Sequence, residues 1–294
     1  MFIKISENPF FLLLLAVLFW SGNFIVGRAV RYDIDPISLA FWRWCIAALI
    51  AVFLSRKYIQ NDMREMCKNW PIMIVLSSTG VACFNTLVYI GLQSTVAVNG
   101  LLLQAMIPVL TVVLSFVLFK ERLTIAQLVG VVISLVGVLT IISKGDFSLL
   151  TRLQVNHGDV LVFLAVVCYS VYSVFLRKRP KVHPLSFVAA SFVLGTFMLL
   201  PFYLTCATTF LPPATLPSVG AIAYVAIFPS IVSYLCYNRG VELAGANKAS
   251  MFIYLMPVFG SLMAIIFLGE SLFFFHFIGI FCIACGIYFS TKRR

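Results

Sequence analysis

The fold is decided by a pattern that occurs twice, as IPVLTVVLSFVLFKERLTIAQLVGVVISLVGV at 107–138 and as MPVFGSLMAIIFLGESLFFFHFIGIFCIACGI at 256–287. Each stretch has a proline near its start, a glutamate in the middle and two glycines further on. The two sets match at a constant offset of 149 residues, which indicates an internal repeat. The matched pairs are Pro108 and Pro257, Glu121 and Glu270, Gly130 and Gly279, and Gly137 and Gly286.

The repeat extends far beyond these two stretches. Ser21 and Gly91 recur at the same offset as Ser170 and Gly240. Near the second apolar segment the offset becomes 148, as a single inserted or deleted residue would produce, because Pro36 and Ser38 match Pro184 and Ser186. We therefore predict a first repeat over 1–143, a linker loop over 144–157 and a second repeat over 158–294.

The composition indicates a chain whose main solvent is lipid. Hydrophobic residues make up 62% of the sequence and charged residues 11%, and the mean hydropathy is +1.06. Soluble domains carry about twice that share of charge. A helix needs roughly 20 largely apolar residues to cross a bilayer. Ten stretches qualify: 10–30, 36–55, 71–92, 97–119, 124–143, 158–178, 184–204, 217–240, 246–268 and 272–290.

Five helices in each repeat would make the second repeat enter the membrane from the opposite side. We therefore predict an all-α membrane protein of ten transmembrane helices, built from two inverted five-helix repeats. The first apolar stretch reaches spanning length, so we expect a retained helix rather than a cleaved signal. Carriers use inverted repeats to form a site near the bilayer midplane that opens alternately to either side.

The distribution of basic residues predicts the orientation. With both termini in the cytoplasm, sixteen of the 21 lysines and arginines fall on the cytoplasmic side and four on the other. This is a strong positive-inside bias. The net charge of +11 therefore indicates orientation rather than nucleic-acid binding. Since the loops are short, we expect a multi-pass protein of a bacterial inner (plasma) membrane.

The sequence of the repeated stretches resembles a known family, the ten-helix EamA branch of the drug/metabolite transporter superfamily. The resemblance covers FWSGNF at 19–24, Pro36, Arg43 and the two long stretches quoted above. It implies an exporter or exchanger of amino acids, related metabolites or drugs. One departure is visible, because the counterpart of Arg43 in the second repeat is Ser191. Any function of Arg43 is thus asymmetric.

Polar side chains within the apolar spans are the candidate solute contacts, because such groups usually face a cavity or the protein interior. Asn85 and Tyr89 lie at i and i+4, and their counterparts Tyr234 and Asn238 repeat the pair in swapped order. The full candidate set is Trp20, Asn23, Arg43, Asn85, Tyr89, Gln104, Tyr169, Tyr172, Tyr234, Asn238 and Tyr254.

Structural alternatives stand beside these assignments. The amides could bridge two helices instead of lining a cavity, and Arg43 could anchor its helix instead of attracting an anionic or zwitterionic solute. We interpret Tyr224 and Tyr237 as interfacial-belt residues. Thr124 and Ser271 are candidate N-caps, with Glu121 and Glu270 close to the positive helix ends. The paired glycines Gly130, Gly137, Gly279 and Gly286 are expected to serve helix packing.

The spans contain no aspartate or glutamate at mid-depth, so carboxylate-based proton coupling has no support. We find no catalytic motif and expect no enzyme activity, no cofactor and no metal, with Cys282 and Cys285 as packing residues. We predict a secondary transporter of small neutral or zwitterionic metabolites, with amino acids, including aromatic ones, as the leading class. A lipid flippase or scramblase and a drug efflux carrier are the alternatives. The expected partners are a small-molecule substrate and membrane lipids, and we expect a monomer.

Overall fold

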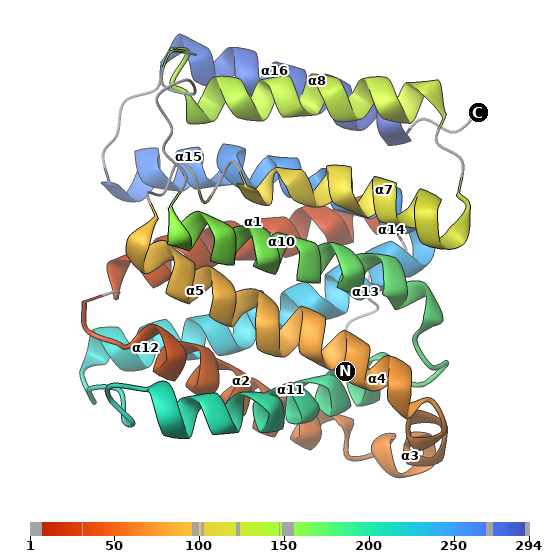
Figure 1. The fold of residues 1–294 in the computed structure, drawn as a ribbon, viewed down its shortest axis with the longest axis vertical. Coiled ribbons are helices and arrows are strands. Elements are labelled where there is room, and N and C mark those ends of the chain that lie inside the picture. The colour runs from red at the N-terminus through yellow and green to blue at the C-terminus, as the bar shows by residue number, and fades with distance from the viewer. Residues whose placement is uncertain are drawn as a thin grey trace.

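The computed structural model describes residues 8–30, 32–95, 100, 103–121, 124–146, 148, 156–268 and 273–291. Within these ranges the regular structure is helical throughout, and the long helices lie side by side (Figure 1). The α-helices are α1 (Pro9–Ala29), α2 (Pro36–Ser55), α3 (Ile59–Lys68), α4 (Trp70–Ser77), α5 (Phe84–Ser94), α7 (Met106–Phe119), α8 (Ile125–Ile142), α10 (His157–Phe175), α11 (Pro184–Cys206), α12 (Leu216–Val225), α13 (Ser233–Ala244), α14 (Ala246–Met251), α15 (Met256–Leu268) and α16 (Phe274–Thr291).

Eight helical segments in the described part of the chain are long and apolar enough to cross a membrane. They coincide with eight of the ten expected spans. The expected spans 97–119 and 246–268 are not among them. In the first of these, the described helix α7 has 14 residues, and residues 97–99, 101 and 102 lie outside the described part. The second is divided into α14, a 3₁₀ turn at Phe252–Leu255 and α15.

Proline explains the breaks in these two segments. Pro108 and Pro257 lack a backbone N–H, and each ring crowds the carbonyl group four residues earlier. The backbone departs from the α-helix just before each proline, at the turn residue Ala105 before Pro108 and at Phe252–Leu255 before Pro257. The matching prolines therefore produce matching irregularities.

Side-chain caps fix where several helices begin. The Asp35 carboxylate accepts from the backbone N–H groups of Ile37 and Ser38 at the start of α2. At the start of α8, Thr124 and Gln127 form a reciprocal capping box. The expected N-cap role of Thr124 is thus confirmed, whereas Ser271 and Glu270 lie outside the described residues.

Helices α8 and α16 form a close antiparallel pair at one edge of the molecule (Figure 1). A Cβ atom on Gly130 would lie 2.4 Å from the Gly286 carbonyl oxygen, and one on Gly137 would lie 2.7 Å from the Gly279 carbonyl oxygen. The four glycines therefore let the two backbones touch, which confirms their expected packing role.

The two halves of the chain make matching contacts with each other. Ser21 Oγ donates to the Met256 carbonyl oxygen at 3.3 Å, and its counterpart Ser170 donates to the Ile107 carbonyl oxygen at 3.3 Å. Both pairs are related by the offset of 149. The π-helical turns also correspond, since Ser78–Cys83 matches all but the first residue of Ala226–Val232.

The outer surface of the helices is strongly apolar. Leu49, Ile125 and Phe281 are exposed to 67, 77 and 70%, and many other large apolar side chains are also exposed. A surface of this kind needs an apolar environment. Together with the eight apolar spans, it identifies a multi-pass membrane protein.

Substitution of Gly130 tests the α8–α16 contact. Gly130→Ala should lower stability by about 1–3 kcal/mol, because the added Cβ meets backbone that cannot retreat without separating the helices. Thermal unfolding in detergent measures this loss. Gly220→Ala is the matched control, since a Cβ at that position meets nothing within 4 Å. Equal thermal unfolding midpoints for the two variants would contradict the packing role of Gly130.

Candidate functional site

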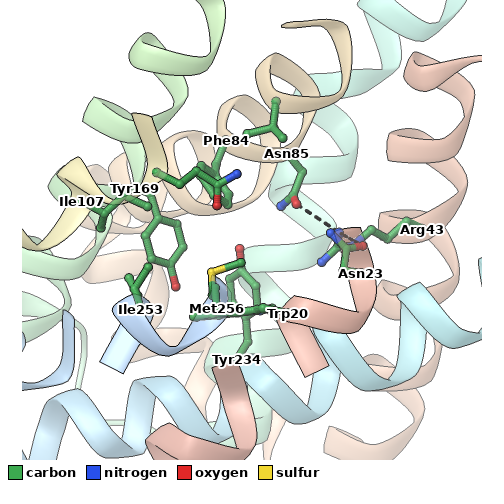
Figure 2. A pocket seen from close by; sticks show the side chains of 12 residues that line it. Trp20, Asn23, Arg43, Phe84, Asn85, Ile107, Tyr169, Tyr234, Ile253 and Met256 are labelled. Atoms are coloured by element: carbon green, nitrogen blue, oxygen red, sulfur yellow. Dashed lines mark hydrogen bonds between the residues drawn. The ribbon is translucent and has the colours of Figure 1, made fainter. Parts of the chain in front are cut away.

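A pocket lies in the middle of the helical assembly, between residues of both halves (Figure 2). Its empty volume is about 440 Å³, including space open to solvent. The part of this space that a water-sized sphere can occupy is about 30 Å³, so the pocket is narrow in this conformation. Its lining residues are Trp20, Asn23, Arg43, Phe84, Asn85, Val88, Gln104, Ile107, Tyr169, Tyr234, Ile253 and Met256.

Arg43 on α2 forms the charged end of the pocket and is only 1% exposed. Its Nη1 lies within hydrogen-bonding distance of Asn23 Oδ1 (3.1 Å), Asn85 Oδ1 (3.0 Å) and the Tyr89 hydroxyl (2.8 Å). Its Nε donates to Ser230 Oγ at 2.7 Å. All four acceptors are neutral. Among the described residues no carboxylate pairs with this guanidinium.

The partners of Arg43 come from several elements that are distant in sequence. Asn23 lies on α1, Asn85 and Tyr89 lie on α5, and Ser230 lies in the π-helical turn that joins α12 to α13. The Ser230 hydroxyl accepts from Arg43 and donates to the Val225 carbonyl oxygen at 2.8 Å. The Tyr89 hydroxyl likewise donates to Asn23 Oδ1 at 3.0 Å. The guanidinium is therefore fixed by a connected network.

An uncharged polar group, Gln104, faces the same pocket from the segment before α7. Gln104 is buried, and neither atom of its amide group has a hydrogen-bond partner. The Tyr169 hydroxyl is also buried without a partner. Gln104 in addition lines a smaller neighbouring pocket with Tyr254, whose hydroxyl is again unpartnered. These groups can hydrogen-bond a ligand at no cost to the internal network.

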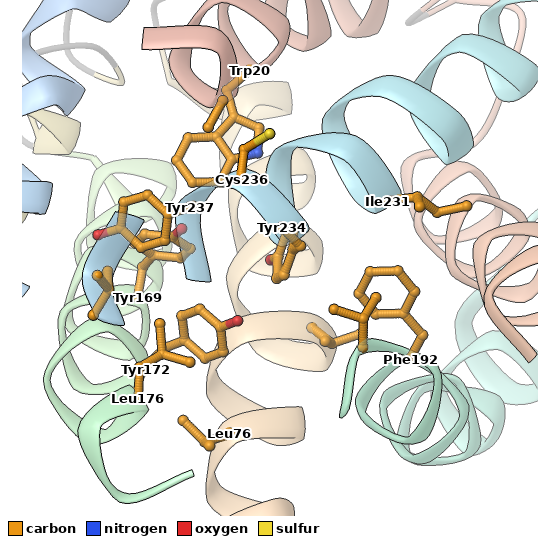
Figure 3. Close-up of a cluster of buried hydrophobic side chains, with 14 of the residues drawn as sticks. Trp20, Leu76, Tyr169, Tyr172, Leu176, Phe192, Ile231, Tyr234, Cys236 and Tyr237 are labelled. Atoms are coloured by element: carbon orange, nitrogen blue, oxygen red, sulfur yellow. The ribbon is translucent and has the colours of Figure 1, made fainter. Parts of the chain in front are cut away.

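Aromatic rings form the wall between the polar groups (Figures 2 and 3). The Trp20 ring lies 5.6 Å from Tyr169 and 6.2 Å from Tyr234, in edge-to-face geometry. Trp20 Nε1 donates to the Pro229 carbonyl oxygen at 3.0 Å, and the Tyr234 hydroxyl donates to the Gly80 carbonyl oxygen. Gly80 and Pro229 match at the offset of 149. The carbonyl groups of the two π-helical turns thus orient the aromatic wall.

The eleven residues predicted from sequence fall into four groups. Seven line the larger pocket, and Tyr254 lines the smaller one together with Gln104. Tyr89 supports Arg43 and Asn23 without lining either pocket. Tyr172 and Asn238 pair with each other, since the Tyr172 hydroxyl donates to Asn238 Oδ1 at 2.7 Å. The seven residues are Trp20, Asn23, Arg43, Asn85, Gln104, Tyr169 and Tyr234.

The interfacial-belt interpretation of Tyr237 is wrong. Its side chain is fully buried, packs 5.0 Å from the Trp20 ring and lies 2.9 Å from Ser173 Oγ through its hydroxyl (Figure 3). Tyr224 is partly buried, and its hydroxyl is 3.4 Å from the Phe19 carbonyl oxygen. The prediction for Tyr237 is wrong because it relies on the closeness of this residue to a helix end in the sequence. The buried aromatic cluster extends along α13 and includes Tyr237.

Several residues at the site were missed by sequence reasoning. Ser230 could have been found, because it precedes Tyr234 by four residues and Asn238 by eight and so shares their helix face. Phe84, Val88 and Met256 line the pocket but carry no signal that separates them from other apolar residues of the spans.

Comparison with known proteins matches both halves of the chain to one transporter family. Residues 8–143 and 156–292 each match the model of the EamA-like transporter family. A Bacillus subtilis protein named uncharacterized transporter YyaM is 31% identical over 85% of this chain and 83% of its own. A Salmonella typhimurium protein named probable amino-acid metabolite efflux pump is 25% identical over 97% of this chain and 95% of its own. A solved crystal structure superimposes with a TM-score of 0.80 at 17% identity over 97% of both chains.

Substitution of Gln104, whose amide has no partner, tests whether this residue binds a ligand or stabilises the fold. Gln104→Met should raise stability by about 1–3 kcal/mol, because it removes buried polar atoms that have no partner. Asn23→Leu should instead lower it, because Arg43 and Tyr89 lose an acceptor. The thermal unfolding temperatures of the two ligand-free variants measure these changes in stability. A loss of stability in Gln104→Met as large as that in Asn23→Leu would assign Gln104 to the structural network.

Proposed function

The chain belongs to the EamA-like transporter family, and on this premise we propose that it is a secondary transporter of small neutral or zwitterionic metabolites, with amino acids, including aromatic ones, as the leading class. The observation that carries the proposal is the central pocket, which combines a buried arginine, the unpartnered amide of Gln104 and aromatic rings. The name of the Salmonella typhimurium relative, an amino-acid metabolite efflux pump, agrees with this class of solute.

Alternating access through two inverted five-helix repeats is part of the proposal. Two family matches, each covering about half of the chain, support two repeats. The antiparallel pairing of α8 with its counterpart α16 supports their inversion. Ten spans follow if α7 and α14–α15 complete the fourth and ninth crossings. We assign the protein to a bacterial inner membrane with both termini in the cytoplasm, on the charge bias described above.

The chemistry of the pocket favours such solutes over a cationic drug. A carboxylate can accept from Arg43 and the neighbouring amides, and an aromatic side chain can stack against Trp20, Tyr169 or Phe84. Among the described residues, no acidic side chain lines either pocket, so a cationic drug would lack its usual partner.

A contact at the cytoplasmic end, as assigned above, is a candidate clamp for the alternating cycle. Glu121, which follows α7, forms a bidentate ion pair with Arg177, with N–O distances of 2.8 and 2.9 Å. Asn247 on α14 donates to the same carboxylate at 3.2 Å. The carboxylate therefore joins three helical segments, and a movement that separates these segments must break its contacts.

Uptake into proteoliposomes tests the proposed function. Purified protein should give saturable uptake of at least one radiolabelled member of a panel of amino acids that includes phenylalanine, tryptophan and threonine, with or without a pH gradient. Asn85→Ala should reduce that uptake at least tenfold, as expected from loss of a hydrogen bond to a charged group worth about 1.5–3 kcal/mol.

Asn61→Ala is the matched control, because Asn61 is exposed on α3. Both variants should reach the membrane in normal amounts. Saturable uptake that is unchanged by Asn85→Ala would remove the pocket from the transport path. No uptake of any panel member, together with movement of labelled lipids between leaflets, would favour a flippase.

Loss of the Glu121 carboxylate should change conformation more than stability. The pair is partly exposed, so Glu121→Gln should cost only about 0–1 kcal/mol. It should increase the rate at which a cysteine at Val88, in the pocket, reacts with a membrane-impermeant thiol reagent added from the Glu121 side. Glu65→Gln on α3 is the control. Equal labelling rates in both backgrounds would contradict the clamp.

A further inference from the structure

The charged end of the pocket offers hydrogen-bond donors rather than acceptors. A guanidinium group can only donate, so the side-chain oxygens of Asn23 and Asn85 must face Arg43. Their N–H₂ groups are therefore turned away from it (Figure 2). Arg43 Nη2 and Asn23 Nδ2 make no hydrogen bond within the described part of the chain. The unused hydrogen-bonding capacity at this end thus suits an acceptor with negative charge.

The guanidinium also lacks a counter-charge. Its four partners are neutral oxygens, and no described aspartate or glutamate lines the pocket or pairs with it. A buried charge without an opposite charge is costly in a membrane protein. An anionic ligand would supply the missing charge and would bind through charge-assisted hydrogen bonds, which are stronger than neutral ones.

The opposite end of the pocket has no carboxylate among the described residues that line it. Gln104 and the Tyr169 hydroxyl are neutral, and the remaining wall is aromatic or aliphatic. The ammonium group of an amino acid would find one amide oxygen, hydroxyl lone pairs and ring faces. The described lining is therefore electrostatically one-sided, with a fixed positive charge and no fixed negative one.

We propose that the pocket recognises its solute through a carboxylate bound at Arg43, and that the ammonium group of an amino acid is dispensable. Small organic monocarboxylates with an aryl or branched aliphatic body are then ligands of the same site, whereas the corresponding amines are not. This inference rests on the proposed transport function, and it changes the substrate class from neutral or zwitterionic solutes to carboxylates with or without an ammonium group.

Matched sets of three ligands test the proposal on the purified full-length protein. Each set compares an amino acid with two analogues, the carboxylate that lacks the ammonium group and the amine that lacks the carboxylate. The three sets carry a phenyl, an indolyl and an isobutyl group. The readouts are the shift in thermal unfolding temperature and competition with uptake in proteoliposomes. The carboxylate should bind within about tenfold of the amino acid, and the amine about ten- to hundredfold more weakly, as loss of a charge-assisted hydrogen bond implies.

Arg43→Gln should remove the preference for carboxylates in the thermal-shift assay, and Arg43→Lys should keep part of it, because lysine retains the charge without the planar fork. Arg64→Gln, at an exposed position on α3, is the control. If either Arg43 variant fails to fold, the order of ligand affinities for the unmodified protein tests the proposal on its own.

The outcomes separate this inference from the proposed function. Binding of carboxylates without uptake of any amino acid would support the site and reject the amino-acid assignment. Amines that bind as tightly as carboxylates, or carboxylates that have no effect for any of the three groups, would overturn the inference even if amino-acid uptake is found.

Discussion

The arrangement of the pocket depends on one buried charge, the guanidinium of Arg43. Its hydrogen bonds connect α2 to α1, to α5 and to the π-helical turn before α13. Because all of these partners are neutral, the network orients the charge without cancelling it. The same contacts that hold the helices at their spacing therefore leave a positive site facing the pocket. Structural anchoring and attraction of a solute, which the sequence left as alternatives for Arg43, are compatible in this geometry.

The surrounding scaffold is close to symmetric, but the polar groups of the site differ between the two halves. Asn23 pairs with Tyr89 in the same way that Tyr172 pairs with Asn238, at positions related by the offset of 149 but with amide and phenol exchanged. In the first pair the amide also accepts from Arg43. The residue that answers Arg43 is Ser191, which is buried and has no hydrogen-bond partner for its hydroxyl. The exchange of Arg43 for Ser191 therefore confines the buried positive charge to one half of the chain.

Much of this could be predicted from sequence because it depends on local composition and periodicity. Apolar length located eight of the spans, the offset identified the packing glycines, and helix faces selected most of the polar residues at the pocket. The contacts between helices could not be predicted, since a single sequence gives faces but not neighbours. The convergence of Asn23, Asn85 and Ser230 on Arg43 is therefore known only from the structure. The π-helical turns and the lack of partners for Gln104 were also hidden, because both depend on packing between distant segments, and the burial of Tyr237 was misjudged for the same reason.

The most direct test of the account is a crystal structure of the protein with a brominated aryl carboxylate, in which the bromine atom is located by its anomalous signal. The account predicts the bromine against Trp20, Phe84 and Tyr169, with the carboxylate oxygens within hydrogen-bonding distance of Arg43. A ligand bound with its carboxylate away from Arg43, or outside this pocket altogether, would contradict the central claim that the buried guanidinium holds the solute.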